Sequence, residues 1–469
     1  MREPMSDASA YLETLRKPLG KLPDPLPLRT LAELTGNSAP RFKCAIMPPG
    51  SKSLSNRALL IAALAEGDSL IKRPLLDADD AKRMLGALRT LGVGVEAHPK
   101  GDFVVVRGAG GELRGGCELF LNNAGTATRF LTAAAVLAHG PVEIDGNERM
   151  RERPLGELIG LLRELGAEIE ELGEPGFVPI RIEGRGTLRG GEIVIPTTQS
   201  SQFVSALVMV APWFEEGLTI HLEGEITSGS YIDMTTGLLA GVAGAEVFVS
   251  EDGRTIEIAP GGYGCFEYEV EPDASGATYL WGAAALFPGS LCRVPGMHFT
   301  ALQHDARFPM VLRRMGCPIE YSGGSGNVTG AKALEGLDEA DLSQMPDTAM
   351  TLAAVAAFAE GPTRITGLRT LRVKETDRIE AIATELSKIG CRVDTKADEL
   401  TVTPPEGGVD CSAGCEAVTF DTYDDHRMAM SLALIGLRRP NVFINDPGCV
   451  NKTYAGFWAD LASIYEAAL

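Results

Sequence analysis

From Arg41 onward, the hydrophobic and polar positions of the chain follow a repeating pattern. Six runs rich in Ala, Leu and Val have the length and composition of buried helices, and each of the first five ends at a glycine. These glycines stand at positions 67, 140, 217, 289 and 361, so their spacing is nearly constant. So regular a spacing predicts internal copies of one structural unit. The six runs cover positions 57–67, 129–140, 202–217, 278–289, 348–361 and 427–437.

A second series of helical segments is more polar and keeps in step with the first. Its first five members end in an apolar residue followed by glycine, at positions 92, 166, 244, 316 and 390. Glycine is the usual residue just past a last helical turn. Each unit therefore reads strand, helix, strand, helix and further strands. The period is longer than the roughly 20–45 residues of a solenoid repeat, so the pattern predicts six small α/β subdomains.

The ends of the chain predict how these six units are grouped. The sixth copy stops after its second helix, at positions 455–468, and a strand-like segment at 42–47 precedes the first copy. The simplest closure puts this segment into the last unit, so that both termini share one domain. A chain of 469 residues is too long for one ordinary domain. We expect one domain from positions 41–50 with 272–469, a second from 51–271, an N-terminal extension at 1–40, and a ligand site in the cleft between the domains.

Cations stand at several predicted helix starts, where they are electrostatically disfavoured. Lys52 and Arg57 flank the start that follows the Pro48-Pro49-Gly50 breaker, and Arg129 and Arg427 begin two other buried runs. Because the N-terminal end of a helix is already positive, such cations destabilise it unless an anion binds there. Lys374 and Arg378 likewise form a like-charged pair in i, i+4 spacing. These positions predict a site for anions, and solvated surface charge is the alternative.

Composition excludes several other kinds of partner. The net charge of −20 argues against nucleic acid or an anionic membrane surface as the partner. The nine cysteines are scattered without a Cys-x-x-Cys pair, and the histidines lack ligand spacing, so we expect reduced thiols and no metal site. The chain has no apolar run of membrane-spanning length and no apolar N-terminal segment. We expect a soluble cytoplasmic protein.

Seven motifs, in one order from about Arg41 to the C-terminus, resemble those of the EPSP synthase (3-phosphoshikimate 1-carboxyvinyltransferase) family. They are Pro49-Gly50-Ser51-Lys52-Ser53-Leu54-Ser55-Asn56-Arg57, Asn123-Ala124-Gly125-Thr126-Ala127, Arg149-Met150-Arg151-Glu152-Arg153-Pro154, Ser200-Ser201-Gln202-Phe203, Tyr231-Ile232-Asp233, Arg372-Val373-Lys374-Glu375-Thr376-Asp377-Arg378 and Asp425-His426-Arg427-Met428-Ala429-Met430. The resemblance implies an α/β fold, a two-domain inside-out α/β barrel of six βαβαββ repeats, three per domain. It also implies transfer of the enolpyruvyl group of phosphoenolpyruvate to the 5-hydroxyl of shikimate 3-phosphate, without a cofactor, by a monomer.

The resemblance also implies which residues bind and react. Shikimate 3-phosphate would be held by Lys52, Ser53, Arg57, Ser200, Ser201, Gln202, Ser228, Tyr231, Asp347 and Lys374. Phosphoenolpyruvate would be held by Lys52, Gly125, Thr126, Arg149, Gln202, Arg378, Arg427 and Lys452. Lys52, Asp347 and Glu375 are the implied catalytic groups, and the division of acid and base roles among them stays open.

Three departures from the family pattern limit what can be transferred. Thr370 stands where the family often has Asn, no lysine precedes Tyr231, and Thr128 and Phe130 stand where common versions have Met and Pro. The resemblance therefore implies nothing about glyphosate sensitivity. One alternative is the sister transferase that acts on UDP-N-acetylglucosamine, but Ser53 rather than Asn follows Lys52. The other is a non-catalytic, anion-binding protein of the same fold.

Overall fold

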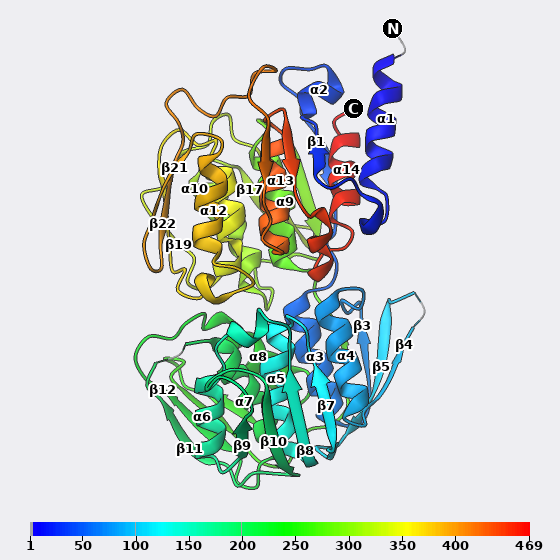
Figure 1. Cartoon of the computed structure of the whole chain (residues 1–469), viewed down its shortest axis with the longest axis vertical. Helices are drawn as coiled ribbons and strands as arrows, with labels where there is room; N and C mark the ends of the chain where they lie inside the picture. The colour runs from blue at the N-terminus through cyan, green and yellow to red at the C-terminus, as the bar shows by residue number, and fades with distance from the viewer. Residues whose placement is uncertain (1–2, 99, 198) are drawn as a thin grey trace. The chain divides into compact units, whose positions relative to one another are not determined.

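The computed structural model describes residues 3–98, 100–197 and 199–469. The chain divides into two compact units: unit 1 is residues 1–49 with 272–469, and unit 2 is residues 50–271. Both units are built from mixed parallel and antiparallel sheets and from helices (Figure 1). The fold is therefore mixed α/β.

Unit 2 contains three sheets in the described part of the chain. The first sheet has, in hydrogen-bonded order, the strands β15 (Glu267–Glu269), β3 (Glu66–Lys72), β5 (Phe103–Ala109) and β4 (Gly94–Ala97). The second has β7 (Cys117–Phe120), β8 (Ala138–Asp145), β10 (Ile180–Arg185) and β9 (Glu168–Glu171), and β6 (Leu113–Arg114) also pairs with β8. The third has β11 (Gly191–Ile195), β12 (Leu218–Leu222), β14 (Thr255–Ile258) and β13 (Val247–Val249). In each sheet the first strand is parallel to the second, and the remaining pairs in that order are antiparallel.

Unit 1 also contains three sheets in its described residues, and two have the same strand order. These are β2 (Lys43–Ala45), β16 (Leu291–Pro295), β18 (Ser325–Thr329) and β17 (Ile319–Ser322); and β19 (Ala340–Asp341), β20 (Thr363–Thr366), β22 (Leu400–Thr403) and β21 (Arg392–Thr395). The third sheet has three strands, β23 (Val418–Phe420), β24 (Val442–Ile444) and β1 (Leu26–Leu28).

The six apolar runs form buried helices, as predicted. They are α3 (Lys52–Leu64), α5 (Gly125–Ala134) and α7 (Ser201–Val210) in unit 2, and α9 (Ala274–Ala285), α11 (Ala349–Ala356) and α13 (His426–Gly436) in unit 1. Within each unit these three helices contact one another. A helix that is apolar on all sides must be covered on all sides, so these helices form the interior of each unit.

The predicted bounds are within one residue at both ends of α13, but they were wrong by several residues at both ends of α3 and at the C-terminal end of α7. Helix α3 begins at Lys52 because the Ser51 side chain accepts a hydrogen bond from the amide of Leu54. The same helix ends at Leu64, and Gly67 lies inside strand β3 rather than at the helix end. Gly67 therefore occupies a strand position with a φ of 93°, which favours glycine.

The more polar helices are also present. They are α4 (Asp79–Thr90), α6 (Gly156–Glu164), α8 (Ser230–Gly241), α10 (Phe308–Arg314), α12 (Arg378–Ser387) and α14 (Phe457–Glu466). Gly92, just after α4, has a φ of 90°, the left-handed conformation expected of a glycine that ends a helix.

The N-terminal segment closes the last sheet, but not through the strand that the sequence predicted, so that prediction was wrong. Strand β2 does not enter that sheet; it pairs with β16, where Cys44 lies opposite Cys292. Strand β1 pairs with β24 instead, with Leu26 opposite Ile444. An uncovered strand edge exposes unpaired backbone groups, and β1 covers this one.

The described residues of the segment 1–40 therefore pack as part of unit 1. Leu26 and Leu28 are buried, and helix α1 (Glu3–Leu15) contacts α14. Leu12 and Leu15 join the hydrophobic core of unit 1. The Leu-Pro-Leu strand gives little sequence signal because it is short and contains a proline, a residue that edge strands tolerate.

Candidate active site

Seven charged side chains of unit 1 form what we call the Asp347 cluster. It contains three carboxylates and four cations: Asp347, Glu375, Asp425, Lys374, Arg378, Arg427 and Lys452. Asp347 lies in η6 (Pro346–Thr348) before α11, Arg378 begins α12, and Asp425 caps the start of α13. Within this set, cations exceed carboxylates by one.

Arg378 contacts all three carboxylates of the cluster. Its Nε and Nη2 donate to the Asp425 carboxylate over 2.7 and 3.2 Å. Its Nη1 donates to Asp347 over 3.0 Å, and its Nη2 also donates to Glu375 over 2.8 Å. Burial alone would lower the pKa of this guanidinium, but Asp425, Glu375 and Asp347 outweigh burial and raise it. Arg378 is therefore a fixed, permanent cation.

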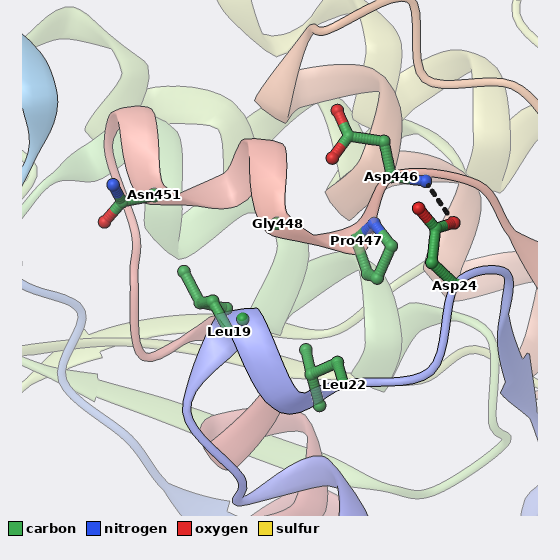
Figure 2. A pocket seen from close by; sticks show the side chains of 8 residues that line it. Leu19, Leu22, Asp24, Asp446, Pro447, Gly448 and Asn451 are labelled. Carbon is green, nitrogen blue, oxygen red and sulfur yellow. Dashed lines mark hydrogen bonds between the residues drawn. The ribbon is translucent and has the colours of Figure 1, made fainter.

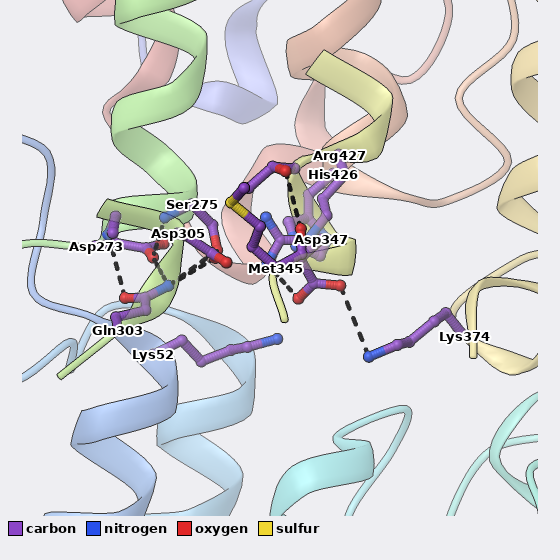
Figure 3. Close-up of polar contacts among 12 residues, drawn as sticks. Lys52, Asp273, Ser275, Gln303, Asp305, Met345, Asp347, Lys374, His426 and Arg427 are labelled. Carbon is purple, nitrogen blue, oxygen red and sulfur yellow. Dashed lines mark hydrogen bonds and ion pairs between the residues drawn. The ribbon is translucent and has the colours of Figure 1, made fainter. Parts of the chain in front are cut away.

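Asp347 accepts hydrogen bonds or ion pairs from three cations. Besides Arg378, Arg427 donates from Nη2 over 2.8 Å, and the Lys374 Nζ lies 3.6 Å from Oδ1 (Figure 3). Oppositely charged neighbours favour the ionised form, so the Asp347 carboxylate is a hydrogen-bond acceptor.

Two further contacts hold the remaining members. Lys452, the last residue of η8 (Pro447–Lys452), lies 3.2 Å from the Glu375 carboxylate. Arg427 Nη1 donates to the Tyr279 hydroxyl over 3.4 Å. Burial raises the pKa of Tyr279 to about 12, so this hydroxyl stays neutral and can accept from Arg427.

Arg57 is the centre of a second site, in unit 2, and is 1% exposed. It donates from Nε to Thr235, from Nη1 to the Ser53 carbonyl, and from Nη2 to Ser205 and the Tyr231 carbonyl, over 2.7 to 3.2 Å. These bonds use four of the five N–H groups of a guanidinium. The cation also lies over the rings of Phe130 and Tyr231.

The Arg57 guanidinium is held by neutral groups. Among the residues that the structure describes, no carboxylate pairs with it, and burial lowers its pKa to about 10. A buried charge without an opposite partner is costly in a protein interior. Arg57 is therefore suited to bind a ligand anion.

Gly125, the first residue of α5, lies against two other guanidinium groups. A Cβ at this position would lie 2.5 Å from the Arg153 Cζ and 2.7 Å from the Arg129 Nη1. Arg129 Nη1 donates to the Gly125 carbonyl over 3.1 Å, and Arg153 Nη1 donates to the Asn123 side chain over 3.0 Å. A side chain at this position would therefore require both guanidinium groups to move.

Smaller polar contacts surround these groups in unit 2. The Lys52 Nζ lies 3.4 Å from the buried Asp80 carboxylate. Gln202 Nε2 donates to Thr126 over 3.1 Å, and the Ser200 side chain accepts from the Gln202 amide as the cap of α7. Ser228 precedes α8 with a φ of 54°.

The structure brings together most of the predicted residues within each unit. In unit 1, Asp347, Lys374, Glu375, Arg378, Arg427 and Lys452 all belong to the Asp347 cluster. In unit 2, Arg57 contacts the Ser53 and Tyr231 backbones, and Thr126 contacts Gln202. Ser201, beside the cap of α7, is buried.

Arg149 is the predicted residue that the geometry favours least. It pairs with Glu152 over 2.8 Å, with its side chain 32% exposed. Arg153, later in the same basic motif, is 4% exposed and is the one that touches Gly125. The intervening 3-10 turn η3 (Met150–Glu152) decides which arginine faces inward, and sequence spacing did not reveal that turn.

Three further residues of the site were not predicted from the sequence: Asp425, Tyr279 and Asp80. Asp425 stood inside a quoted motif beside Arg427, and its capping position was the available signal. Tyr279 lies within an apolar run, where nothing distinguished it from packing residues. Asp80 stood in the first turn of α4, where an acidic residue needs no function because it suits the helix dipole.

A cavity of about 640 Å³ in unit 1 lies between the N-terminal segment and η8 (Figure 2). Asp24 and Asp446 line it together with Leu19 and Leu22, and Asp24 accepts a hydrogen bond from the Asp446 amide over 2.9 Å. Burial, followed by Asp424 and Asp24, raises the pKa of Asp446. An acidic lining of this kind repels anions, so this cavity is not the anion site.

Two kinds of feature are absent from the described residues. No group of three or more His, Cys, Asp or Glu side chains there is placed to hold a metal ion. Within the same residues, no helix is both long and apolar enough to cross a membrane.

The chain is similar to known proteins over most of its length. The family model of EPSP synthase (3-phosphoshikimate 1-carboxyvinyltransferase) matches residues 38–461. The 3-phosphoshikimate 1-carboxyvinyltransferase of Serratia proteamaculans is 42% identical over 429 residues, covering 90% of this chain and 96% of the relative. That of Cupriavidus necator is 42% identical over 448 residues, covering 92% of this chain and all of the relative.

Solved structures of similar fold agree with these matches. An EPSP synthase from Acinetobacter baumannii has a TM-score of 0.74 at 27% identity and covers 91% of this chain and 97% of its own. The enolpyruvyl transferase NikO from Streptomyces tendae has a TM-score of 0.68 at 17% identity, over 91% of this chain and 95% of its own, which shows similarity of fold alone.

Proposed function

The chain belongs to the EPSP synthase family, and we propose that it carries out the 3-phosphoshikimate 1-carboxyvinyltransferase reaction with the charged groups described above. The enzyme transfers the enolpyruvyl group of phosphoenolpyruvate to the 5-hydroxyl of shikimate 3-phosphate and releases phosphate. Both substrates are anions. The observation that carries the assignment of residues is the Asp347 cluster, in which four cations meet three carboxylates.

Phosphoenolpyruvate has a carboxylate and a phosphate, and guanidinium groups bind both well because they donate two parallel hydrogen bonds. We assign it to Arg378, Arg427 and Lys452 of unit 1. From unit 2 we assign Lys52, Thr126, Gln202, Gly125 and Arg153. Arg153 replaces Arg149 here because it is buried against Gly125 and its Nε has no hydrogen-bond partner among the described residues.

Shikimate 3-phosphate needs one phosphate site, one carboxylate site and partners for its hydroxyls. We assign it to Lys52, Ser53, Arg57, Ser200, Ser201, Gln202, Ser228 and Tyr231 of unit 2, and to Asp347 and Lys374 of unit 1. The buried Arg57, which no described carboxylate neutralises, supports this assignment.

The reaction is an addition followed by an elimination, and the addition needs one proton removed from the hydroxyl and one delivered to carbon. Asp347 is an ionised acceptor, and in this proposal it takes the proton of the 5-hydroxyl. Glu375 delivers a proton to the methylene carbon, and the Lys452 ammonium, 3.2 Å from its carboxylate, can supply that proton. In the elimination that follows, one methyl proton of the tetrahedral intermediate returns to the Glu375 carboxylate as the C–O bond to phosphate breaks and the carbon–carbon double bond re-forms. Lys52 stabilises the negative charge of the departing phosphate.

The overall architecture is part of the same proposal. We take the six segments to be copies of one βαβαββ repeat, arranged as a two-domain inside-out α/β barrel with domains at 41–50 with 272–469 and at 51–271. The order of parallel and antiparallel strands, which recurs from sheet to sheet, supports this view. We further propose that the protein is a monomer and that it is cytoplasmic, the location being supported by the nine free cysteines.

Phosphate release by the purified protein tests the function. We expect release only when shikimate 3-phosphate and phosphoenolpyruvate are both present, and none when UDP-N-acetylglucosamine replaces the first. Release with the sugar nucleotide instead would favour the sister transferase. Binding of both anions without turnover would favour a non-catalytic protein of this fold.

A further inference from the structure

A buried polar network at the start of α9 takes no part in the function proposed above. Its members are Asp273, which caps α9, Ser275, Gln303 and Asp305 of η5 (His304–Arg307). Their exposed fractions lie between 1% and 4%. Figure 3 shows these four side chains beside Asp347 and Arg427.

Neutral groups hold the Asp305 carboxylate. Ser275 donates its hydroxyl to Asp305, and Gln303 Nε2 lies 3.0 Å from the same oxygen. Gln303 also reaches Asp273 Oδ1 over 3.1 Å and accepts from the Ala274 amide over 3.1 Å, so its amide is fixed in one orientation. The position of the Asp305 carboxyl is therefore well determined.

No cation forms an ion pair with Asp305 among the residues that the structure describes. Burial, followed by the nearby Asp347, raises its pKa to about 6, whereas Ser275, Arg427 and Gln303 act in the opposite direction. The charged and titratable groups around it are Asp347 and Arg427, Asp273 at the start of α9, and His304 and Arg307 on its own turn. A buried carboxylate that only neutral donors contact destabilises the folded protein, whereas a neutral asparagine at the same position would not carry this cost.

The buried Asp305 carboxylate can be explained by its effect on the nearby Asp347. Three cations contact Asp347, and neighbouring positive charge makes a carboxylate a weaker base. A base must still be able to take a proton near the operating pH. A second negative charge close to Asp347 opposes the three cations.

We propose that Asp305 is a positioning residue that acts through Asp347, its fixed negative charge keeping Asp347 basic enough to accept the substrate's hydroxyl proton. The proposal rests on the assignment of Asp347 as proton acceptor. The proton moves from the 5-hydroxyl oxygen to a carboxylate oxygen of Asp347, and Asp305 exchanges no atoms with substrate.

The variant Asp305→Asn tests this proposal because it keeps the shape and removes the charge. We expect kcat to fall about three- to tenfold with both KM values unchanged, and the acid limb of the kcat profile to move about one pH unit lower. The folded state of the wild type binds the Asp305 proton more tightly than the unfolded chain does, so its stability falls as pH rises from about 4 to about 6. At pH 8 the variant should therefore melt about 2–4 °C higher than the wild type.

Asp460→Asn is the matched control. Burial also raises the pKa of the Asp460 carboxyl, which lies in α14. Its hydrogen-bond partner, however, is the hydroxyl of Tyr454, which precedes α14 and lies 2.7 Å away. We expect this variant to leave the acid limb in place. A purely structural role for Asp305 predicts lower stability of Asp305→Asn with an unmoved acid limb, and that result would overturn the proposal.

Asp347→Asn separates the proposal from its premise. We expect it to lower kcat at least about a hundredfold. If it retains wild-type turnover, the assignment of Asp347 fails, and the role of Asp305 fails with it. If Asp347→Asn is inactive and Asp305→Asn has the wild-type pH profile, only the role of Asp305 is refuted.

Discussion

Arg378 and Asp425 form a two-point ion pair that is almost completely withdrawn from solvent. The two contacts measure 2.7 and 3.2 Å, and the side chains are 1% and 0% exposed. Asp425 also caps α13 by accepting from the Arg427 amide over 2.9 Å. One carboxylate thus joins the start of α12 to the start of α13 and sets the backbone from which Arg427 projects.

Asp425→Asn should destabilise the protein strongly, because it leaves the Arg378 charge buried with one partner fewer. Removing one member of a buried pair costs about 3–5 kcal/mol. Asparagine is itself a good cap, so loss of the cap does not explain the effect. Urea unfolding monitored by circular dichroism measures the change in free energy.

Asp394→Asn serves as the control for this variant, since Asp394 pairs with Arg392 on the surface of the same unit, where both side chains are more than half exposed. An exposed pair contributes about 0–1 kcal/mol. Equal losses in the two variants would show that burial of the Asp425 pair has no special weight.

Arg153→Gln and Arg149→Gln form a matched pair that tests which arginine of the basic motif binds substrate. We expect Arg153→Gln to weaken phosphoenolpyruvate binding about tenfold or more, because a charged hydrogen bond contributes about 1.5–3 kcal/mol. Arg149→Gln should change binding by less than about threefold. Calorimetry in the presence of shikimate 3-phosphate gives both constants, and the reverse order would restore the assignment made from sequence.

Arg427→Ala and Ser200→Ala test whether the two substrates have separate sites. Arg427→Ala should mainly raise KM for phosphoenolpyruvate, and Asp347 keeps Arg378 and Lys374 as partners in this variant. Ser200→Ala should mainly raise KM for shikimate 3-phosphate. Both effects should be about tenfold or more. Steady-state kinetics with each substrate varied in turn gives both KM values. If each variant raised the two KM values equally, the substrates would not have separate sites.

Leu28→Ala tests whether the N-terminal segment belongs to the core. Leu28 is 4% exposed and packs on Gly436, where a Cβ would lie 2.6 Å from its Cδ1. Truncating a buried leucine costs about 2–5 kcal/mol. Leu172→Ala, at a position that is 45% exposed, should cost far less in the same denaturant titration. A neutral Leu28→Ala would mean that β1 contributes little to the stability of unit 1.

The sequence predicted the presence of the helices well because their apolar runs, and the glycines that follow the more polar helices, are local signals. It predicted the strand pairings less well. The segment 42–47 has the pattern of a strand, but its partner β16 begins only at Leu291, in the second half of the chain, and no local pattern specifies it. Strand β1 was missed because so short a strand, containing proline, has no periodicity to detect.

The site shows the same limit. Cations such as Lys52, Arg57 and Arg427 could be found because they stand where a helix dipole disfavours them, and Arg378 because of its like-charged i, i+4 spacing to Lys374. Arg153 could not be separated from Arg149, because a single 3-10 turn decides which one is buried. Asp305 was invisible because its importance comes from burial without a cation, a property of tertiary structure alone.

Glu375→Gln provides the most direct test of the claim that the Asp347 cluster performs the chemistry. Glutamine keeps the shape of Glu375 but cannot carry a proton to carbon. A rapid-quench single-turnover experiment, with the enzyme in excess over one substrate and saturated with the other, separates the chemical step from product release. We predict a rate about two to four powers of ten below that of the wild type, with the dissociation constants of both substrates changed by less than about fivefold. A wild-type single-turnover rate in this variant would contradict the account.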